Sequence, residues 1–371
     1  MIIKKLELCN FRNYKRETFI FNSETNVLYG DNAQGKTNVL ESIFVAGTTK
    51  SHKGSKDREI IKMPENEGHI RMFVEKGGIY HKIDIHMKKS ASKGIAIDGI
   101  PTRKSSDLIG LVNIVFFSPE DLSIIKNGPA ERRRFINMEL CQINKIYLYN
   151  LTKYNKILQQ RNNLLKQIGF NSELMDTLDV WDQQMEKIGK NIISERRNLI
   201  QALNSITKEI YLKLTENKEK IEIIYDPNTT EELFRENIIL SREKDLILKT
   251  TNIGPHRDDI IVRVNGSDVR KYGSQGQQRT AALSLKLAEI EIVKKVAKEN
   301  PILLLDDVLS ELDRKRQNTL LENIKGIQTI ITCTGLEEFI KNGININKTF
   351  QIENGKIKTE EKQIGMEVNH E

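Results

Sequence analysis

The sequence predicts an α/β domain that is interrupted by a mostly helical insertion. A strand pattern over residues 19–29 runs into a glycine-rich loop and then a helix, which is a βα unit. Over residues 129–218, apolar side chains recur at three- and four-residue spacing, which is typical of long helices. From residue 274 to residue 332, helices and strands alternate again, and this alternation is typical of parallel βαβ units.

Residues 1–118 are expected to form the N-terminal part of the α/β domain. Residues 1–8 alternate apolar and polar side chains, as a half-buried strand does. Asp98-Gly99 predicts a hairpin turn, because both central positions of such a turn need positive φ. Further strands are predicted over residues 70–75, 80–87, 94–97 and 111–117.

Residues 119–250 are expected to form the inserted lobe. Its helical pattern breaks at residues 169–178, and this short connection favours an antiparallel pair of helices, each about 35–55 Å long, that forms an arm. The α/β domain is expected to resume over residues 251–360, and the polar residues 361–371 to form a flexible tail. Strands are predicted over residues 221–225, 260–264, 301–305 and 328–332, and helices over residues 277–297 and 313–324.

The net charge of +7 and the pI near 9.0 favour an anionic partner, with nucleic acid first and a membrane surface second. A generally lysine-rich proteome explains the same charge, so both readings stay open. No stretch approaches the ~20 apolar residues of a membrane span, and the N-terminus lacks the apolar core of a signal peptide. Cys9, Cys141 and Cys333 lie far apart and predict reduced thiols. We therefore expect a cytoplasmic protein that does not bind a membrane.

The chain carries the phosphate-loop pattern Gly-x4-Gly-Lys-Thr between a predicted strand and a predicted helix. The glycines let the backbone turn tightly, so that its N–H groups and the helix N-terminus surround phosphate oxygens. Lys36 is expected to contact the β- and γ-phosphates, and the Thr37 hydroxyl to coordinate Mg²⁺. The loop thus predicts binding of ATP with Mg²⁺ by Gly30, Asp31, Asn32, Ala33, Gln34, Gly35, Lys36 and Thr37.

An apolar strand that ends in Asp306-Asp307 is the expected partner of this loop. The strand would deliver the Asp306 carboxylate beside Mg²⁺. Asp307 would face the γ-phosphate and orient or deprotonate the attacking water. A strand followed by an acidic helix cap gives the same pair of residues by itself. In a chain that also has a phosphate loop, the catalytic reading is favoured, with Asp307 and Lys36 as the catalytic residues.

A second helix N-terminus begins at Ser274-Gln275-Gly276. Ser274 can cap the helix, while Gly276 permits close approach of a ligand to the backbone, and Gln277 lies in the first turn. An ordinary capped helix fits these residues equally well when they are viewed alone. Because the chain already has one complete phosphate loop, a second phosphate-binding terminus favours a nucleotide held between two copies of the chain.

These motifs in this order resemble the ABC-type ATPase head, and more closely the RecF family of bacterial recombination-repair proteins. The resemblance covers nearly the whole chain. It is carried by Asn10-Phe11-Arg12-Asn13-Tyr14, the phosphate loop with Asn38, Phe117-Ser118-Pro119-Glu120-Asp121-Leu122, Arg132-Arg133-Arg134-Phe135, Gly254-Pro255-His256-Arg257-Asp258-Asp259, Ser274 to Arg279, and Asp306-Asp307 with Ser310-Glu311-Leu312-Asp313.

The resemblance implies a cytoplasmic ATPase head with a helical second lobe that dimerises on ATP and hydrolyses it slowly. It further implies binding to single-stranded DNA or to gapped duplex at single-strand/duplex junctions. Relatives act with RecO and RecR to load RecA, and so support repair, replication and the SOS response. The resemblance also places Arg12 among the nucleotide contacts. Where relatives often have arginine after the first helix, this chain has Lys53, which puts a bidentate phosphate contact there in doubt.

Two groups of basic residues are candidate DNA contacts. Lys50, Lys53, Lys56 and Arg58 lie on a polar segment near the phosphate loop. Arg132 and Arg133 lie with Arg134 on a predicted helix, where a solvated face is the plain alternative.

His256 could act as a base. It is expected instead to have a structural role at the junction of the two lobes, paired with Asp258 or Asp259.

The alternative function is the nucleotide-binding subunit of an ABC transporter. Such subunits carry glutamate after the Mg²⁺-side aspartate and a histidine after the last strand, whereas this chain has Asp307 and Thr332-Cys333-Thr334. They also need a glutamine-centred coupling loop, but Phe117-Ser118-Pro119-Glu120 stands in that region. These differences favour the repair ATPase and predict weak hydrolysis.

Overall fold

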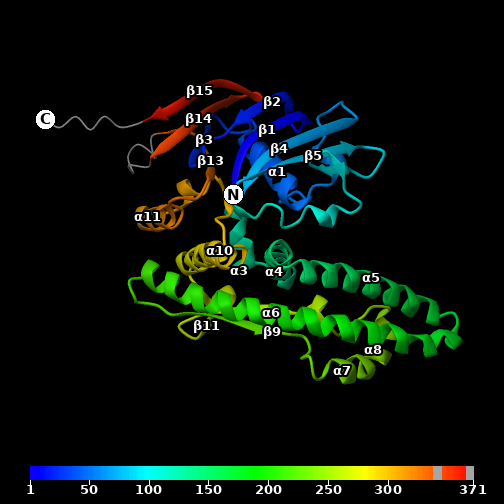
Figure 1. The fold of residues 1–371 in the computed structure, drawn as a ribbon. Coiled ribbons are helices and arrows are strands. Elements are labelled where there is room, and N and C mark those ends of the chain that lie inside the picture. The colour runs from blue at the N-terminus through cyan, green and yellow to red at the C-terminus, as the bar shows by residue number, and fades with distance from the viewer. Residues whose placement is uncertain (337–344, 365–371) are drawn as a thin grey trace. The chain divides into compact units, whose positions relative to one another are not determined.

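The computed structural model describes residues 1–336 and 345–364 and divides into two compact units. Unit 1 contains the described residues of 1–121 and 289–371, and unit 2 is formed by residues 122–288. Figure 1 shows the strands of unit 1 in blue, cyan, orange and red, and the helices of unit 2 in green and yellow.

A mostly parallel sheet forms the centre of unit 1, with its strands in the order β15-β14-β3-β13-β12-β8. All neighbours pair in parallel except β15, which runs antiparallel to β14. The central strands are buried along nearly their whole length, as expected where both faces of a parallel sheet are covered. The strands are β3 (Thr25–Tyr29), β8 (Ile114–Phe117), β12 (Ile302–Asp306), β13 (Thr329–Cys333), β14 (Ile346–Glu353) and β15 (Lys356–Ile364), and the helices with them are α1 (Lys36–Thr48) and α11 (Arg314–Asn323).

A second, antiparallel sheet of unit 1 has the order β2-β1-β4-β5-β6-β7. Its strands alternate between buried apolar and half-exposed polar residues, so that one face lies on the core. The elements are β1 (Ile2–Phe11), β2 (Tyr14–Ile20), α2 (Asp57–Ile60), β4 (Glu67–Lys76), β5 (Ile79–Lys88), β6 (Gly94–Ile97) and β7 (Ile100–Pro101).

Unit 2 combines the predicted helices with a small antiparallel sheet in the order β11-β10-β9. Helix α10 begins in this unit and continues past its boundary into unit 1. The elements are α3 (Leu122–Lys126), α4 (Pro129–Ile143), α5 (Lys145–Ile168), α6 (Leu178–Leu214), β9 (Ile221–Asp226), α7 (Phe234–Leu240), α8 (Arg242–Leu248), β10 (Asp259–Val264), β11 (Ser267–Asp268), α9 (Val269–Tyr272) and α10 (Gln275–Ala297).

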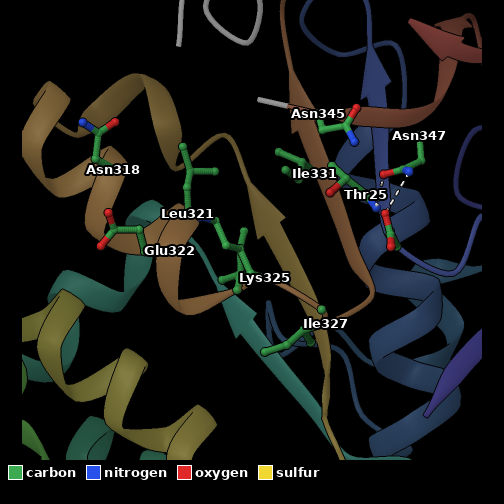
Figure 2. Close-up of a pocket in the computed structure, with 12 residues that line it drawn as sticks. Thr25, Asn318, Leu321, Glu322, Lys325, Ile327, Ile331, Asn345 and Asn347 are labelled. Carbon is green, nitrogen blue, oxygen red and sulfur yellow. Dashed lines mark hydrogen bonds between the residues drawn. The ribbon is translucent and has the colours of Figure 1, made fainter. Parts of the chain in front are cut away.

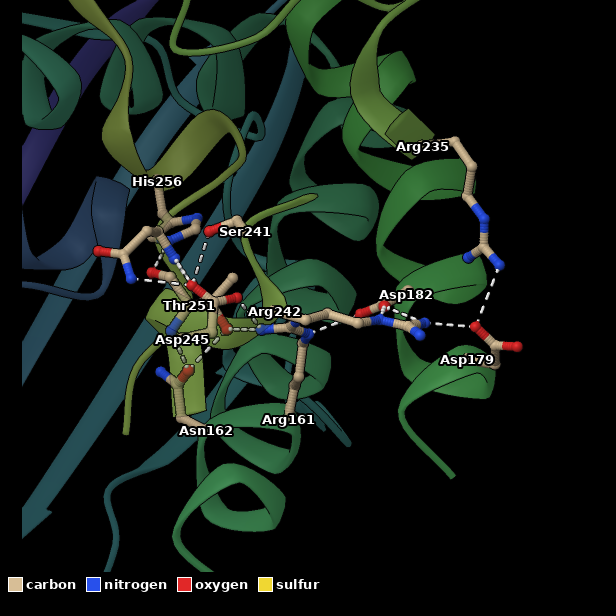
Figure 3. Close-up of polar contacts among 11 residues, drawn as sticks. Arg161, Asn162, Asp179, Asp182, Arg235, Ser241, Arg242, Asp245, Thr251 and His256 are labelled. Carbon is tan, nitrogen blue, oxygen red and sulfur yellow. Dashed lines mark hydrogen bonds and ion pairs between the residues drawn. The ribbon is translucent and has the colours of Figure 1, made fainter. Parts of the chain in front are cut away.

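Helices α5 and α6 form the predicted arm, and a buried ion-pair network lies between them (Figure 3). The Arg161 guanidinium is fully buried and donates to Asp182 and Asp245, in each case at 2.7 Å. Thr251 accepts a further hydrogen bond from it at 2.9 Å. Such buried charges are tolerated only when they are paired. The network therefore ties α5 to α6 and to α8.

Two predicted boundaries differ from the structure. The α/β domain was expected to resume at residue 251, but the compact units divide between Ala288 and Glu289, because β10 pairs with β9 and α4 packs on β10. The flexible tail was expected from residue 361, whereas β15 continues to Ile364 in register with β14. The remaining tail residues, 365–371, lie outside the described residues.

Candidate nucleotide-binding site

The predicted phosphate loop connects β3 to α1 and has the backbone geometry that such a loop needs. Gly30 has φ 141° and Gly35 has φ 116°, both in the region that favours glycine. A Cβ atom would lie 2.5 Å from the Ile352 carbonyl oxygen at Gly30, and 2.5 Å from the Asn13 side chain at Gly35. No larger residue fits either position. The N-terminus of α1 is therefore open to an anion.

Two hairpin turns from opposite ends of the chain hold this loop. From the β1–β2 turn, the Asn13 side-chain amide donates to the Gln34 carbonyl at 2.8 Å, and the Tyr14 hydroxyl to the Gly35 carbonyl at 3.1 Å. From the β14–β15 turn, the Asn354 N–H donates to the Gln34 side chain at 2.7 Å. Sequence reasoning used Asn13 and Tyr14 only to identify the resemblance and missed Asn354, because nothing local in the sequence connects a turn to a loop 320 residues away.

The Lys36 ammonium lies inside the loop. It donates to the carbonyl oxygens of Gly30 at 2.6 Å and Asp31 at 2.8 Å. Burial lowers the pKa of Lys36, and the nearby charge of Asp307 acts in the opposite direction. A phosphate would replace these carbonyl acceptors with a full negative charge, which a partly buried ammonium binds more strongly.

Thr37, Asp306 and Thr332 meet at the carboxyl ends of three strands. The Thr37 and Thr332 hydroxyls both donate to the same Asp306 carboxylate oxygen at 2.8 Å, although Thr37 and Asp306 are 269 residues apart in the chain. A hydroxyl and a carboxylate oxygen are hard ligands of the kind that Mg²⁺ prefers in nucleotide sites. The donor set therefore fits Mg²⁺, as expected for Thr37 and Asp306.

Asp307 is held in an unusual backbone conformation. Its φ of 55° lies in the left-handed region, which aspartate adopts more readily than most residues. Its N–H donates to the Thr332 hydroxyl at 3.0 Å, and its carbonyl accepts from the Ser310 hydroxyl at 2.8 Å. The side chain is exposed, while the backbone is fixed on both sides. Thr332 was not predicted as a site residue, although it lies near the carboxyl end of the parallel strand β13, where sites of this architecture collect residues.

Replacing Thr332 with valine is expected to lower ATP turnover by on the order of 10- to 100-fold, because both aspartates lose the group that orients them. The Kd for ATP should change little, since the phosphate loop is untouched. Thr332→Ser keeps the hydroxyl and should restore turnover, which simple loss of packing would not allow. Thr329→Val in the same strand is the matched control, because its hydroxyl donates to the Ile327 carbonyl instead. Equal turnover in Thr332→Val and Thr329→Val would contradict this role.

Arg12 occupies a different place from the one expected of a nucleotide contact. Its guanidinium makes two 2.7 Å bonds to the fully buried Glu41 carboxylate of α1. It also donates to the Ser55 hydroxyl at 2.8 Å and to the Glu59 carbonyl at 3.1 Å. Arg12 therefore connects α1 to the basic segment 50–59, and the structure does not bring its guanidinium onto the phosphate loop.

The other half of the predicted site belongs to unit 2. Ser274 and Gln277 form a reciprocal cap, in which the Gln277 N–H donates to the Ser274 hydroxyl at 3.2 Å and the Ser274 N–H to the Gln277 side chain at 2.9 Å. The Gln277 amide also donates to Glu219 at 2.7 Å. Gly276 lies in the first turn of α10, and phosphate binding at this helix start stays a prediction.

Sequence comparison decides the family. The pattern of the RecF/RecN/SMC N-terminal domain matches residues 2–358. A Lachnoclostridium phytofermentans protein named "DNA replication and repair protein RecF" is 60% identical over 96% of this chain and 99% of its own length. The chain belongs to the RecF family. A Lachnospira eligens protein of the same name is 56% identical over 97% of this chain and 100% of its own length.

Solved structures agree with RecF-family membership. The structure described as "the recombination mediator protein RecF-ATP in RecFOR pathway" has a TM-score of 0.90, with 35% identity over 97% of each chain. The Smc head domain of Pyrococcus furiosus has a TM-score of 0.57 at 17% identity, which shows a shared fold. The predicted ABC-type ATPase head is thus confirmed, and the transporter alternative is not favoured. No helix among the described residues has both the length and the apolar character that crossing a membrane requires.

The structure contradicts the predicted role of Arg132 as a DNA contact of this RecF-family protein. Its side chain is buried and makes two hydrogen bonds to the Asp259 carboxylate, at 2.6 and 2.8 Å. It also donates to the Asn127 carbonyl at 2.7 Å. Arg133 donates to the Asp258 carbonyl at 2.7 Å and is half-buried. In the sequence, three consecutive arginines on a helix indicate a basic surface. In the structure, Arg132 is buried instead and joins α4 to β10.

The basic residues that follow the phosphate-loop helix stay candidate DNA contacts of this chain. Lys50, Lys53, Lys56 and Arg58 are all exposed on the segment between α1 and β4. Glu41 accepts a hydrogen bond from the Ser51 hydroxyl at 2.5 Å. The same carboxylate that binds Arg12 therefore also fixes the start of this segment. The contacts of Glu41 thus hold in place the segment after α1 that carries these exposed cations.

His256 is structural, but its partners are not the predicted aspartates. Its Nδ1 lies 2.9 Å from the Tyr154 hydroxyl and its Nε2 3.0 Å from the Thr251 carbonyl. Asp258 instead pairs with the buried Arg196 at 2.7 Å. Burial lowers the pKa of His256 to about 4, helped by nearby cationic charge.

This pKa predicts loss of stability in mild acid. The unfolded chain binds a proton on His256 near pH 6.5, whereas the folded chain binds it only near pH 4. The stability that neutral His256 contributes is therefore full above pH 6.5 and is lost as the pH falls from 6.5 to 4. The expected loss of unfolding free energy is about 3 kcal/mol over this whole window, of which about 2 kcal/mol is lost by pH 5.0. Urea unfolding at pH 7.5 and 5.0 should show a flatter pH dependence for His256→Gln than for wild type. An unchanged pH dependence would contradict the prediction.

A pocket of about 420 Å³ lies elsewhere in unit 1 (Figure 2). It opens beside α11 and the starts of β3 and β14, where the Asn347 side chain bonds to Thr25 and Glu24. In parallel sheets, ligands bind at the carboxyl ends of strands. This pocket is at the opposite edge from Thr37 and Asp306, so it is separate from the nucleotide site.

Proposed function

We propose that this chain is an ATP-switched DNA-binding protein of recombinational repair and replication. The observation that carries the proposal is the meeting of Thr37, Asp306 and Thr332 beside an open phosphate loop. The curated relatives are named for DNA replication and repair, and a solved relative is described with ATP in the RecFOR pathway. ATP hydrolysis by this chain is proposed to be weak and stimulated by DNA.

In this proposal Mg²⁺ is held by Thr37 and Asp306, and when bound it neutralises phosphate charge. Lys36 binds the β- and γ-phosphates. Asp307 accepts a proton from the attacking water or orients it, with its backbone held by Thr332 and Ser310. Gln34 and Asn13 keep the loop in shape, because their side chains connect it to the two hairpin turns.

The binding site for the γ-phosphate is proposed to be completed by a second copy of the chain. Ser274, Gly276 and Gln277 form a capped helix start that can bind an anion. ATP would then act as the bridge of a homodimer. The exposed Lys53, Lys56 and Arg58 are proposed to contact the DNA backbone at gaps or in single strands. By family relationship, RecO and RecR are the proposed partners, and the cytoplasm is the proposed location.

ATP with Mg²⁺ is expected to double the mass of the wild-type chain in light scattering, while Ser274→Arg stays monomeric. The arginine side chain would fill the space in front of the capped helix start. Ser267→Arg, at the exposed start of β11 in the same unit, is the control and should dimerise. A wild-type monomer at saturating ATP would overturn the dimer proposal. Equal dimerisation of both variants would remove Ser274 from the interface.

A further inference from the structure

The middle of the arm carries exposed lysines and amides, whereas the exposed carboxylates of α6, Asp179 and Glu209, lie outside this stretch. The exposed residues of α5 from Lys145 to Gln167 and of α6 from Gln183 to Ser205 form this surface, which we call the arm face. On the other side, α6 packs on β9 and α7, and α5 on α8. The lysines of the arm face are Lys145, Lys153, Lys156, Lys166 and Lys187.

The charge of the arm face differs from that of the whole chain. The chain has 58 lysines and arginines against 51 aspartates and glutamates, a nearly even balance. On the arm face the lysines have no exposed acidic counterpart. The two half-buried carboxylates nearby are already engaged, Glu186 with Lys190 at 2.8 Å and Glu195 with Asn144 at 3.1 Å. Across these two fully described helices, the arm-face lysines form no ion pair. Their charge is therefore available to an anionic partner.

The exposed residues form two straight rows along the helices. Each row repeats at three- and four-residue spacing and extends over about 32 Å, close to the ~34 Å of one turn of B-DNA. The rows are Lys145, Tyr149, Lys153, Lys156, Gln160, Asn163 and Lys166 on α5, and Gln183, Lys187, Asn191, Ser194, Asn198, Gln201 and Ser205 on α6.

Helix pairing places cations of the two rows at the same level along the arm. The Asn144–Glu195 hydrogen bond and the Arg161–Asp182 ion pair set an antiparallel register. Counting from these pairs places residue 187 opposite residues 152–156. Lys153, Lys156 and Lys187 thus lie in the same stretch of the arm. Buried ion pairs of Arg161 stiffen the helix beneath them, so the cations are presented on a rigid support.

We infer that the arm face binds the phosphate backbone of duplex DNA. Lysine, asparagine, glutamine and serine side chains are the usual phosphate-contacting groups, and they position DNA without reading its sequence. Single-strand sites need aromatic platforms for stacking, whereas Tyr149 is the one aromatic residue in the two rows. The inference rests on the proposed DNA-binding function and adds a second, duplex-specific contact to the segment near the phosphate loop.

The triple variant Lys153→Gln, Lys156→Gln, Lys187→Gln tests this inference in the full chain. Binding to a labelled 40-base-pair duplex with ATP and Mg²⁺ is measured over a salt series. Removing three phosphate contacts should reduce the slope of log Kobs against log salt by about 2 to 3, and weaken binding about tenfold at moderate salt. Binding to a single strand of the same length should change less.

A control variant removes the same charge from lysines that already have partners. Lys88→Gln, Lys218→Gln and Lys358→Gln remove cations paired with Glu67, Glu216 and Glu353. This variant should retain the wild-type salt slope. If the arm triple variant also keeps that slope, the arm face is not a DNA contact, while the proposed function stands. A wild-type chain that fails to bind DNA at any salt would overturn both.

Discussion

Asp307→Asn is expected to lower ATP turnover by about 10²–10⁴-fold while leaving ATP binding intact, because the amide cannot accept a proton from water. The backbone of residue 307 keeps its position, since Thr332 and Ser310 bond to its N–H and carbonyl, and the Ser310 hydroxyl reaches its carboxylate only at 3.5 Å. Asparagine also tolerates positive φ. The substitution should therefore change the reaction without disturbing the site.

The same variant is expected to remain dimeric on ATP long after the wild type has returned to monomer. Single-turnover hydrolysis and light scattering over time measure the two effects. Asp226→Asn, an exposed carboxylate at the end of β9, is the matched control and should behave as wild type. Unchanged turnover in Asp307→Asn would show that another group activates the water.

Arg161→Met is expected to destabilise unit 2 by about 3–5 kcal/mol, the usual cost of removing one partner from a buried ion pair. Asp182 and Asp245 are both fully buried and would lose their shared cation. Asp182 keeps its bonds to Arg242 in part, whereas Asp245 keeps only neutral donors such as Ser241 and Asn252. Most of the loss should therefore fall on Asp245, while Arg242 still connects α8 to Asp182 of α6.

Urea unfolding followed by fluorescence measures this loss directly, because Trp181 is the single tryptophan of the chain and packs on the arm core. Gln167→Met, an exposed substitution near the end of the same helix, is the control and should change stability by less than about 0.5 kcal/mol. Equal midpoints for both variants would mean that the ion pairs contribute nothing to the arm.

The nucleotide site could be predicted because its chemistry is concentrated in short motifs. Glycines at φ values of 141° and 116°, and a hydroxyl that reaches Asp306, are direct consequences of the strand–loop–helix pattern. The holding contacts could not be predicted in this way. Asn354 and Thr332 reach the site only through the order of strands in the sheet, which no local pattern states.

The buried arginines show a second limit of sequence reasoning. Arg132 was predicted as an exposed DNA contact, yet it is buried and paired with an aspartate, as are Arg161 and Arg196, for which the sequence predicted no role. A signal for Arg161 was present, since it falls on the same helical stripe as Ile157, Leu164 and Leu165. A charged residue on an apolar stripe indicates a buried partner, although it does not say which one.

The two hairpin turns that hold the phosphate loop also set the time at which it can work during synthesis. The loop itself leaves the ribosome early, whereas Asp306 is made 269 residues after Thr37, and Thr332 and the turn at Asn354 later still. A nascent chain that ends before residue 306 has the glycines, Lys36 and the contacts of Asn13 and Tyr14, but lacks Asp306, Thr332 and the turn at Asn354. We expect such a chain to be unable to trap ATP, so that it can join a partner only after Asn354 has been made.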